Sequence, residues 1–221
     1  MLDLRPVFFI VGLMVSALGI AMFIPMIVDL IYNDNSWRAF GISGILTALF
    51  GASLALATYT PNPDMRAREA FLLTVLSWVS LSIFSAVPFI MEPLKLSITD
   101  ALFEATSGIT TTGATTIVGL DNLPKSILLY RQLLQWIGGM GLIVLAVAVM
   151  PALGIGGGQL YKMELPGSNG NQKLTPRIAD SAQALWKIYV GLTLGCALLY
   201  GLSGMTAFDA IAHSLSTVAG G

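Results

Sequence analysis

The sequence has little charge and almost none of the residues that build metal or catalytic centres. Only 10% of its 221 residues are charged, against roughly 25% in soluble domains, and the formal net charge is −1. With one cysteine, Cys196, and one histidine, His213, the chain forms no internal disulfide and no multi-histidine metal site. No basic surface for nucleic acid is expected. We therefore predict no enzyme activity and no bound cofactor.

Apolar residues make up 55% of the chain and the mean hydropathy is +0.80, which indicates an integral membrane protein. A spanning helix needs about 20 apolar residues. Five nearly charge-free intervals meet this length, and we predict a helix across the lipid bilayer in each: Pro6–Ile31, Ala39–Thr58, Ala70–Met91, Leu133–Leu153 and Ile188–Gly204.

The distribution of Lys and Arg predicts the orientation of these spans. A cytoplasmic N-terminus places seven cations inside and four outside, and we therefore predict a multi-pass membrane protein with its N-terminus in the cytoplasm. The inner group is Arg5, Arg66, Arg68, Lys162, Lys173, Arg177 and Lys187, and the outer group is Arg38, Lys95, Lys125 and Arg131.

Two stretches outside the spans, 97–123 and 205–221, match each other weakly at an offset of 109 residues. "SITD" and "TAFD" both fit the capping box that begins a helix, with Asp100 and Asp209 as the acids. Each stretch therefore predicts a short helix followed by a Thr/Gly-rich return, which is the layout of a re-entrant pore loop. The alternative is an amphipathic helix on the outer surface.

The first return reads "TTTG" within "EATSGITTTGATTI", residues 104–117. Non-helical backbone persists at membrane depth only where it lines water or is buried in protein. Extended Thr/Gly backbone can direct carbonyl oxygens at a cation and replace its hydration shell. Gly113 permits backbone angles that strain other residues, and the preceding helix directs its negative end at the ion. The stretch thus predicts a cation filter.

"SGITTTGATTI" resembles the first selectivity filter of the TrkH/KtrB/HKT superfamily of potassium transporters. "RQLLQWIGGMGLIVLAVAVMP" and "FDAIAHSLSTVAGG" are similar to the following helix and the second pore loop of the TrkH branch. The resemblance implies four fused span, pore loop, span units around one pore that carries potassium. It assigns two filter segments to this chain: Thr110, Thr111, Thr112 and Gly113, then Val218, Ala219, Gly220 and Gly221.

The fold expected from this resemblance is an all-α membrane protein with five transmembrane helices and two re-entrant pore helices. We predict two extra spans over 1–60, a complete unit over 61–155, a cytoplasmic linker over 156–176 and a second unit over 177–221 that stops at its filter. A partial copy of this kind is not expected to conduct potassium alone. The resemblance also implies a location in the bacterial cytoplasmic (inner) membrane, a cytosolic nucleotide-binding (TrkA-like) regulatory subunit and a homodimer of the full-length protein.

Four further positions have alternative interpretations. Glu104 either braces the filter or attracts ions, or it is simply exposed to solvent. His213 aligns with Glu104, and we expect it to pack behind the second filter rather than to gate ions. Arg131 either reaches the outer interface or braces a pore loop. A glycine cluster is predicted to allow close helix packing, with a hinge as the weaker alternative: Gly138, Gly139 and Gly141.

Two other functions compete with potassium uptake. The same fold could serve as a non-conducting scaffold or assembly subunit. A secondary transporter for an organic solute would be expected to carry charged groups deep in its spans, and the charge-free intervals argue against it.

Overall fold

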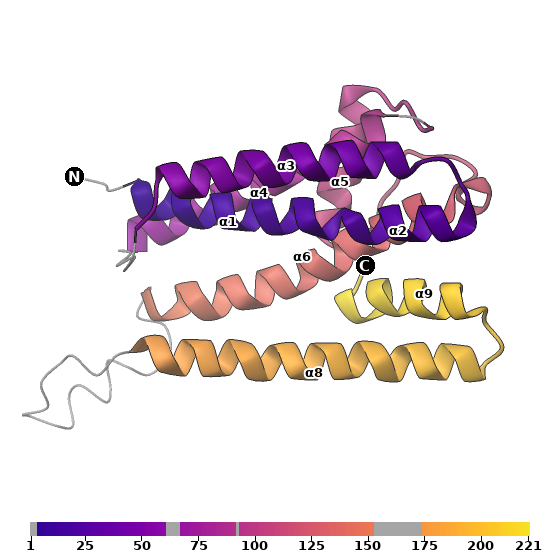
Figure 1. Cartoon of the computed structure of the whole chain (residues 1–221). Helices are drawn as coiled ribbons and strands as arrows, with labels where there is room; N and C mark the ends of the chain where they lie inside the picture. Colours follow the sequence, from indigo (N-terminus) through magenta and orange to yellow (C-terminus); the bar gives the residue numbers. More distant parts are fainter. Residues whose placement is uncertain (1–3, 61–66, 92, 153–173) are drawn as a thin grey trace, which may run out of the picture.

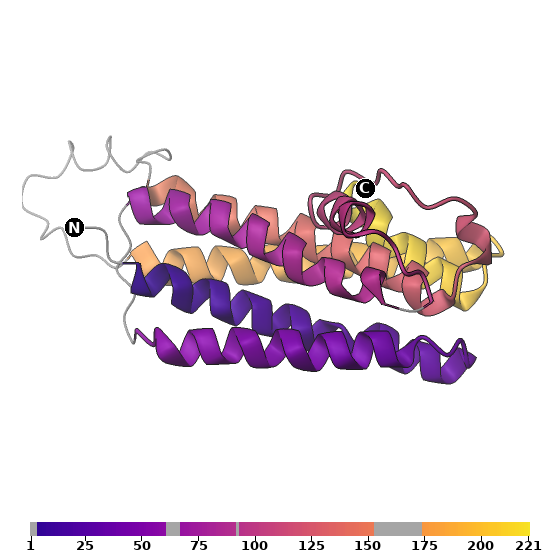
Figure 2. The ribbon, with the colours of Figure 1, turned by 90° about the horizontal axis from the view of Figure 1, so that it is seen from above.

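The computed structural model describes residues 4–60, 67–91, 93–152 and 174–221, and every regular element in these ranges is a helix. The long helices lie side by side, and the two short helices, α5 and α9, occupy the half of the bundle away from the N-terminus (Figures 1 and 2). The elements are α1 (Arg5–Ala21), α2 (Phe23–Tyr32), α3 (Trp37–Ala57), α4 (Ala67–Ile90), α5 (Ile98–Ile109), the 3₁₀ turn η1 (Leu120–Asn122), α6 (Lys125–Ala152), α8 (Leu174–Leu202) and α9 (Ala207–Ala219).

Four helical stretches in the described residues are long and apolar enough to cross a membrane: Arg5–Tyr32, Trp37–Ala57, Arg68–Ile90 and Gln183–Leu202. They coincide with four of the five predicted spans. The fifth predicted span, Leu133–Leu153, lies on α6 up to its last residue, which is outside the described ranges. Five transmembrane helices therefore remain a prediction.

The first span is interrupted between α1 and α2 at Met22. Pro25 has no N–H with which to bond the carbonyl one turn before it, so the helical hydrogen bonds are broken there. Glycines bring α1 against α3: a Cβ on Gly12 would lie 2.6 Å from the backbone nitrogen of Ala55, and one on Gly51 would lie 2.6 Å from the carbonyl oxygen of Gly12. Small residues thus let the two backbones touch.

A buried aromatic cluster joins α3, α4 and α6. The rings of Phe40 and Phe89 lie 5.2 and 5.3 Å from the ring of Tyr130, whose hydroxyl donates to the carbonyl of Ser85 at 3.0 Å. One face of α5 is fully buried against the same cluster through Ala101, Ala105 and Ile109. The core therefore fixes the position of α5, the helix that leads into the predicted filter.

Asp29 of α2 is fully buried and joins three elements. Its Oδ2 accepts hydrogen bonds from the backbone N–H groups of Ser36 and Trp37, at 2.8 and 2.7 Å, and so caps α3. Its Oδ1 accepts from the hydroxyl of Ser126 in α6 at 2.9 Å. A carboxylate in the first predicted span is thus satisfied by the loop after it and by α6.

A second acidic residue ties the same loop to α6. Asp34 Oδ2 accepts a hydrogen bond from the backbone N–H of Lys125 at 2.9 Å. The Lys125 ammonium lies 3.9 Å from the ring centroid of Tyr32 and 5.4 Å from that of Phe208, and the two rings meet edge to face. Lys125 therefore connects α2, α6 and α9.

Two helices begin earlier than the predicted spans. The helix α6 begins at Lys125 rather than near Leu133, and α8 begins at Leu174 rather than near Ile188. Charged residues limited the predicted spans, whereas a helix continues through charges that are paired or lie outside the lipid. The predicted linker over 156–176 lies outside the described residues except for its last three, and the predicted inner cations Arg66, Lys162 and Lys173 also lie outside them.

Candidate functional site

The two short helices begin with the same hydrogen bonds, as the repeat predicted. Ser97 Oγ accepts from the backbone N–H of Asp100 at 3.1 Å and donates to its carboxylate at 2.7 Å. Thr206 Oγ1 makes the equivalent bonds with Asp209 at 3.2 and 2.7 Å. The predicted N-terminal caps of α5 and α9 are confirmed, and both acids lie in the first turn, where the helix dipole favours negative charge.

The ends of α5 and α9 also correspond at the offset of 109 residues. The backbone N–H of Thr112 donates to the carbonyl of Ser107 at 2.9 Å, and that of Gly221 donates to the carbonyl of Ser216 at 3.1 Å. We call residues Thr110–Gly113 the first segment and Val218–Gly221 the second segment. Val218 and Ala219 are the last residues of α9, whereas the first segment begins just after α5 ends.

One backbone position is left-handed in both segments. Gly220 has a φ of 77°, and its counterpart Thr111 has a φ of 57°. A left-handed conformation costs a residue other than glycine about 1–2 kcal/mol, and it is unusual for a β-branched side chain. The first segment therefore holds a strained threonine where the second has a glycine. Gly113, with a φ of 74°, is the next left-handed residue.

The carbonyl oxygens of Thr110, Thr111, Thr112 and Gly113 accept no hydrogen bond from the described residues. Side chains hold this backbone instead: the Thr110 hydroxyl donates to the carbonyl of Thr106 at 2.7 Å and lies 2.8 Å from that of Thr112. The first segment is thus a fixed piece of backbone with four carbonyl oxygens available to a cation.

Glu104 and Arg131 brace the chain that follows the first segment. Glu104 is buried, and its Oε1 accepts from the hydroxyl of Thr115 and the backbone N–H of Thr116, each at 2.6 Å. Its Oε2 pairs with Nε of Arg131 on α6 at 3.0 Å. Both residues hold this stretch of chain, whereas bracing of a filter stays a prediction, and the alternative that Glu104 is exposed to solvent is wrong.

His213 occupies the position equivalent to Glu104 but is exposed, so its expected packing behind the second segment is wrong for the described residues. Its neighbours Ala212 and Ser214 are buried instead.

Two of the three glycines predicted to allow close packing do so. A Cβ on Gly138 would overlap the carbonyl oxygen of Ile109 at the end of α5, and one on Gly139 would lie 2.8 Å from the hydroxyl oxygen of Tyr189. A Cβ on Gly141 would meet nothing within 4 Å. Through Gly138, α6 therefore packs closely against the end of α5, directly before the first segment.

The two segments meet at Gly113 and Gly221, where a Cβ on the first would lie 3.4 Å from the carbonyl carbon of the second.

Among known families, the TrkH family, described as "Cation transport protein", matches residues 36–221. The chain belongs to the TrkH family. This confirms the resemblance to the TrkH branch that the motifs indicated, and the family is one of transport proteins rather than enzymes.

Named members of the TrkH family are similar to this chain over most of its length. The Trk system potassium uptake protein TrkH of Escherichia coli K12 is 52% identical over 211 residues, which cover 95% of this chain and 44% of that protein. TrkG of the same strain is 44% identical over 208 residues, covering 94% and 43%. This chain spans less than half the length of these relatives.

The fold agrees with a solved TrkH structure. The crystal structure of the potassium transporter TrkH from Vibrio parahaemolyticus matches with a TM-score of 0.85 and 44% identity, over 98% of this chain and 43% of that one. The all-helical fold of a membrane protein is therefore established, whereas the ion site at the two segments remains to be tested.

Sequence reasoning about this TrkH-family chain missed two buried polar residues. Asp29 lies within the first predicted span, and a carboxylate inside a span indicates a specific partner. Gln135 was not singled out, yet it is buried and its amide lies beside Gly113 and Gly221. A polar residue within the otherwise apolar predicted span Leu133–Leu153 was the available signal.

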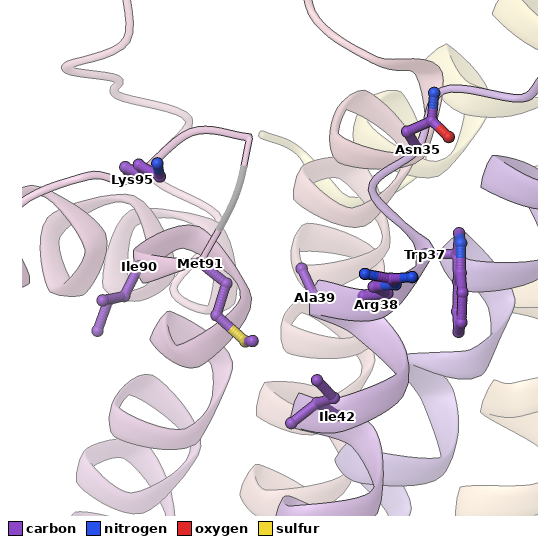
Figure 3. A pocket seen from close by; sticks show the side chains of 8 residues that line it. All are labelled: Asn35, Trp37, Arg38, Ala39, Ile42, Ile90, Met91 and Lys95. Atoms are coloured by element: carbon purple, nitrogen blue, oxygen red, sulfur yellow. The ribbon is translucent and has the colours of Figure 1, made fainter.

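A cleft of about 640 Å³ lies between the start of α3 and the end of α4. Figure 3 shows Arg38 and Lys95 on opposite sides of it, and the Arg38 guanidinium lies 5.4 Å from the ring centroid of Trp37. The cleft shares no residue with either segment and presents cations, so it is unsuited to potassium. In the described residues, no group of three or more His, Cys, Asp or Glu side chains could hold a metal ion.

Proposed function

We propose that the protein carrying this chain takes up potassium across the cytoplasmic membrane as the membrane subunit of a Trk-type system. The first segment, Thr110–Gly113, supplies backbone carbonyls to a selectivity filter, and the second segment, Val218–Gly221, begins the next part of it. Potassium is the transported substrate and not a resident cofactor.

The available carbonyls of the first segment are the observation that carries this proposal. Four consecutive carbonyl oxygens accept no hydrogen bond from the described residues. One of these four residues, Thr111, has a strained left-handed backbone. Unpaired carbonyls at membrane depth are costly unless a ligand or water satisfies them. A dehydrated monovalent cation is the ligand that such oxygens suit best. The C-terminal end of α5 adds a favourable negative potential.

The surrounding architecture follows from the same reasoning. We infer five transmembrane helices, with α5 and α9 as re-entrant pore helices that enter from the outer side, and a cytoplasmic N-terminus. A cytosolic nucleotide-binding regulatory subunit contacts the inner loops, and the full-length protein forms a homodimer. The relatives named as Trk system potassium uptake proteins support this role. These relatives are more than twice as long as this chain.

Ion-competition uptake tests the filter directly. The protein is expressed from its intact gene in bacteria that lack their own potassium uptake, and radiolabelled rubidium uptake is measured against rising sodium or potassium. We expect potassium to compete far better than sodium. Gly113→Ala should reduce this preference, because a side chain at a φ of 74° forces the carbonyls to move.

Gly119→Ala is the matched control. Gly119 has a φ of 76° but lies at the 3₁₀ turn, outside the first segment, and a Cβ there would meet only Asn122 at 3.8 Å. It carries the same backbone strain without touching the filter. Equal loss of selectivity in both variants would contradict the assignment of the first segment. Normal amounts of unaltered protein in the membrane without rubidium uptake would instead favour the scaffold function.

A further inference from the structure

Gln135 of α6 is the side chain that lies where the first and second segments meet. It is only 8% exposed. A Cβ on Gly113 would lie 3.7 Å from Gln135 Nε2, and a Cβ on Gly221 would lie 3.0 Å from its Oε1 and 2.9 Å from its Cδ. One amide group therefore packs against both segments.

This amide is not fully satisfied by the described residues. Oε1 of Gln135 is buried and accepts no hydrogen bond from them, and a buried acceptor without a donor is destabilising. The N–H groups of Gly113 and Gly221 already donate to the carbonyls of Ser107 and Ser216, at 3.4 and 3.1 Å. The amide therefore contacts both glycines without accepting from them, and its Nε2 can donate to a backbone carbonyl. The neighbouring positions Leu133 and Leu134 are apolar and buried, so packing alone does not explain glutamine here.

We propose that Gln135 is a positioning residue for the filter: its amide fixes the separation between the first and second segments. This inference rests on the proposed function. The separation of the segments sets the distance between carbonyls on neighbouring sides of the ion, and both filter size and carbonyl field strength decide which cation is preferred. Gln135 does not touch the ion. It acts through the two backbones that it separates.

The contact also predicts that position 221 requires glycine. Any side chain there would begin within about 3 Å of three atoms of the Gln135 amide, closer than side-chain atoms normally approach. The atoms met are the end of the Gln135 side chain, so the new methyl group would push the amide out of its place between the two segments. Gly221→Ala should therefore remove the contact unless Gln135 is shortened at the same time.

The test measures selectivity in the protein expressed from its intact gene, by sodium and potassium competition against rubidium uptake. Gln135→Leu removes the amide at similar volume and should reduce the preference for potassium over sodium by about tenfold, the effect expected from a change of side-chain shape at a packed position. Gln132→Leu is the matched control: its Oε1 is also buried and unpaired, but it is not among the nearest atoms to Gly113 or Gly221. It should leave the preference unchanged.

A double-mutant cycle tests the contact itself. Gly221→Ala and Gln135→Ala should each reduce selectivity, and the double variant should lose less than the two effects combined, because the shortened side chain makes room for the new methyl group. The readout is a ratio within one population, so smaller amounts of protein do not alter it. Gln135→Met keeps the side-chain length and replaces Gln135→Leu if that variant does not reach the membrane.

The outcomes are distinguishable. Unchanged selectivity in the Gln135 variants, or additive effects in the cycle, would overturn the role of Gln135 while the unaltered protein still selects potassium. Equal losses in the Gln135 and Gln132 variants would do the same, because they would indicate a general effect on α6. An unaltered protein without selective uptake would overturn the proposed function and this inference with it.

Discussion

Replacing Glu104 by glutamine removes one charge behind the first segment and almost nothing else. Glutamine has the same shape, and its Oε1 can still accept from Thr115 and Thr116. Its amide nitrogen, however, would face Nε of Arg131, so two donors would meet where an ion pair at 3.0 Å now exists. The variant therefore tests the charge of the brace and not its volume.

The structure sets the size of the expected effect. Hydrogen bonds to a charged group contribute about 1.5–3 kcal/mol and neutral ones about 0.5–1.5, so the two bonds at 2.6 Å lose roughly 1 kcal/mol each. Breaking a fully buried ion pair costs about 3–5 kcal/mol, but the Arg131 side chain is 16% exposed, which lowers its share. With about 2–3 kcal/mol from the ion pair, the total of about 4–5 kcal/mol would raise the displaced population of the loop roughly a thousandfold or more.

Rubidium uptake with sodium competition measures the consequence. Glu104→Gln should weaken potassium preference and lower the transport rate, because the residues after Gly113 lose their support. Asp100→Asn is the control, since it removes a carboxylate charge from the same helix at a more exposed position that does not contact the loop. If Glu104→Gln protein is present in normal amounts and keeps full selectivity, the bracing argument is wrong.

Three further changes have defined outcomes. Thr111→Gly should relieve about 1–2 kcal/mol of backbone strain and raise the thermal unfolding temperature of purified protein, and a lower temperature would argue against strain there. Gly138→Ala should reduce both folded yield and selectivity because it displaces the end of α5, whereas Gly141→Ala should be neutral in both assays. In a cysteine-free background, an impermeant thiol reagent added outside cells should label a cysteine at Asn122 and not one at Tyr59; the reverse labelling would overturn the cytoplasmic N-terminus.

Local signals allowed much of the fold to be predicted from the sequence. The capping residues Ser97 and Thr206 lie three residues before the acids that they bond, so a four-residue pattern was sufficient to predict where both short helices begin. The offset of 109 residues then related the ends of the helices as well. Long apolar intervals indicated the helices but not their ends. A helix such as α6 continues through a charged residue, here Arg131, when that residue is paired.

The remaining features depend on distant contacts that no local pattern contains. Glu104 meets Arg131 across 27 residues, and Asp29 meets Ser126 across 97. The strain at Thr111 could not be predicted either, since threonine normally avoids a positive φ. Gln135 shows the same limit: its sequence neighbours place it on a helix, and only the packed structure brings it between the two segments.

The acidic residues of the N-terminal helices imply an order of assembly during synthesis. Oδ2 of Asp29 is satisfied by the N–H groups of Ser36, in the loop just after α2, and of Trp37, the first residue of α3, so α1–α3 can enter the bilayer as a unit with that oxygen already paired. Oδ1 of Asp29 and the carboxylate of Asp34 bond residues made 97 and 91 positions later. At about 5–20 residues per second, those partners emerge roughly 5–20 seconds afterwards. The first three helices thus present hydrogen-bond acceptors that are already in place. The first turn of α6 binds these acceptors once α6 has been synthesised.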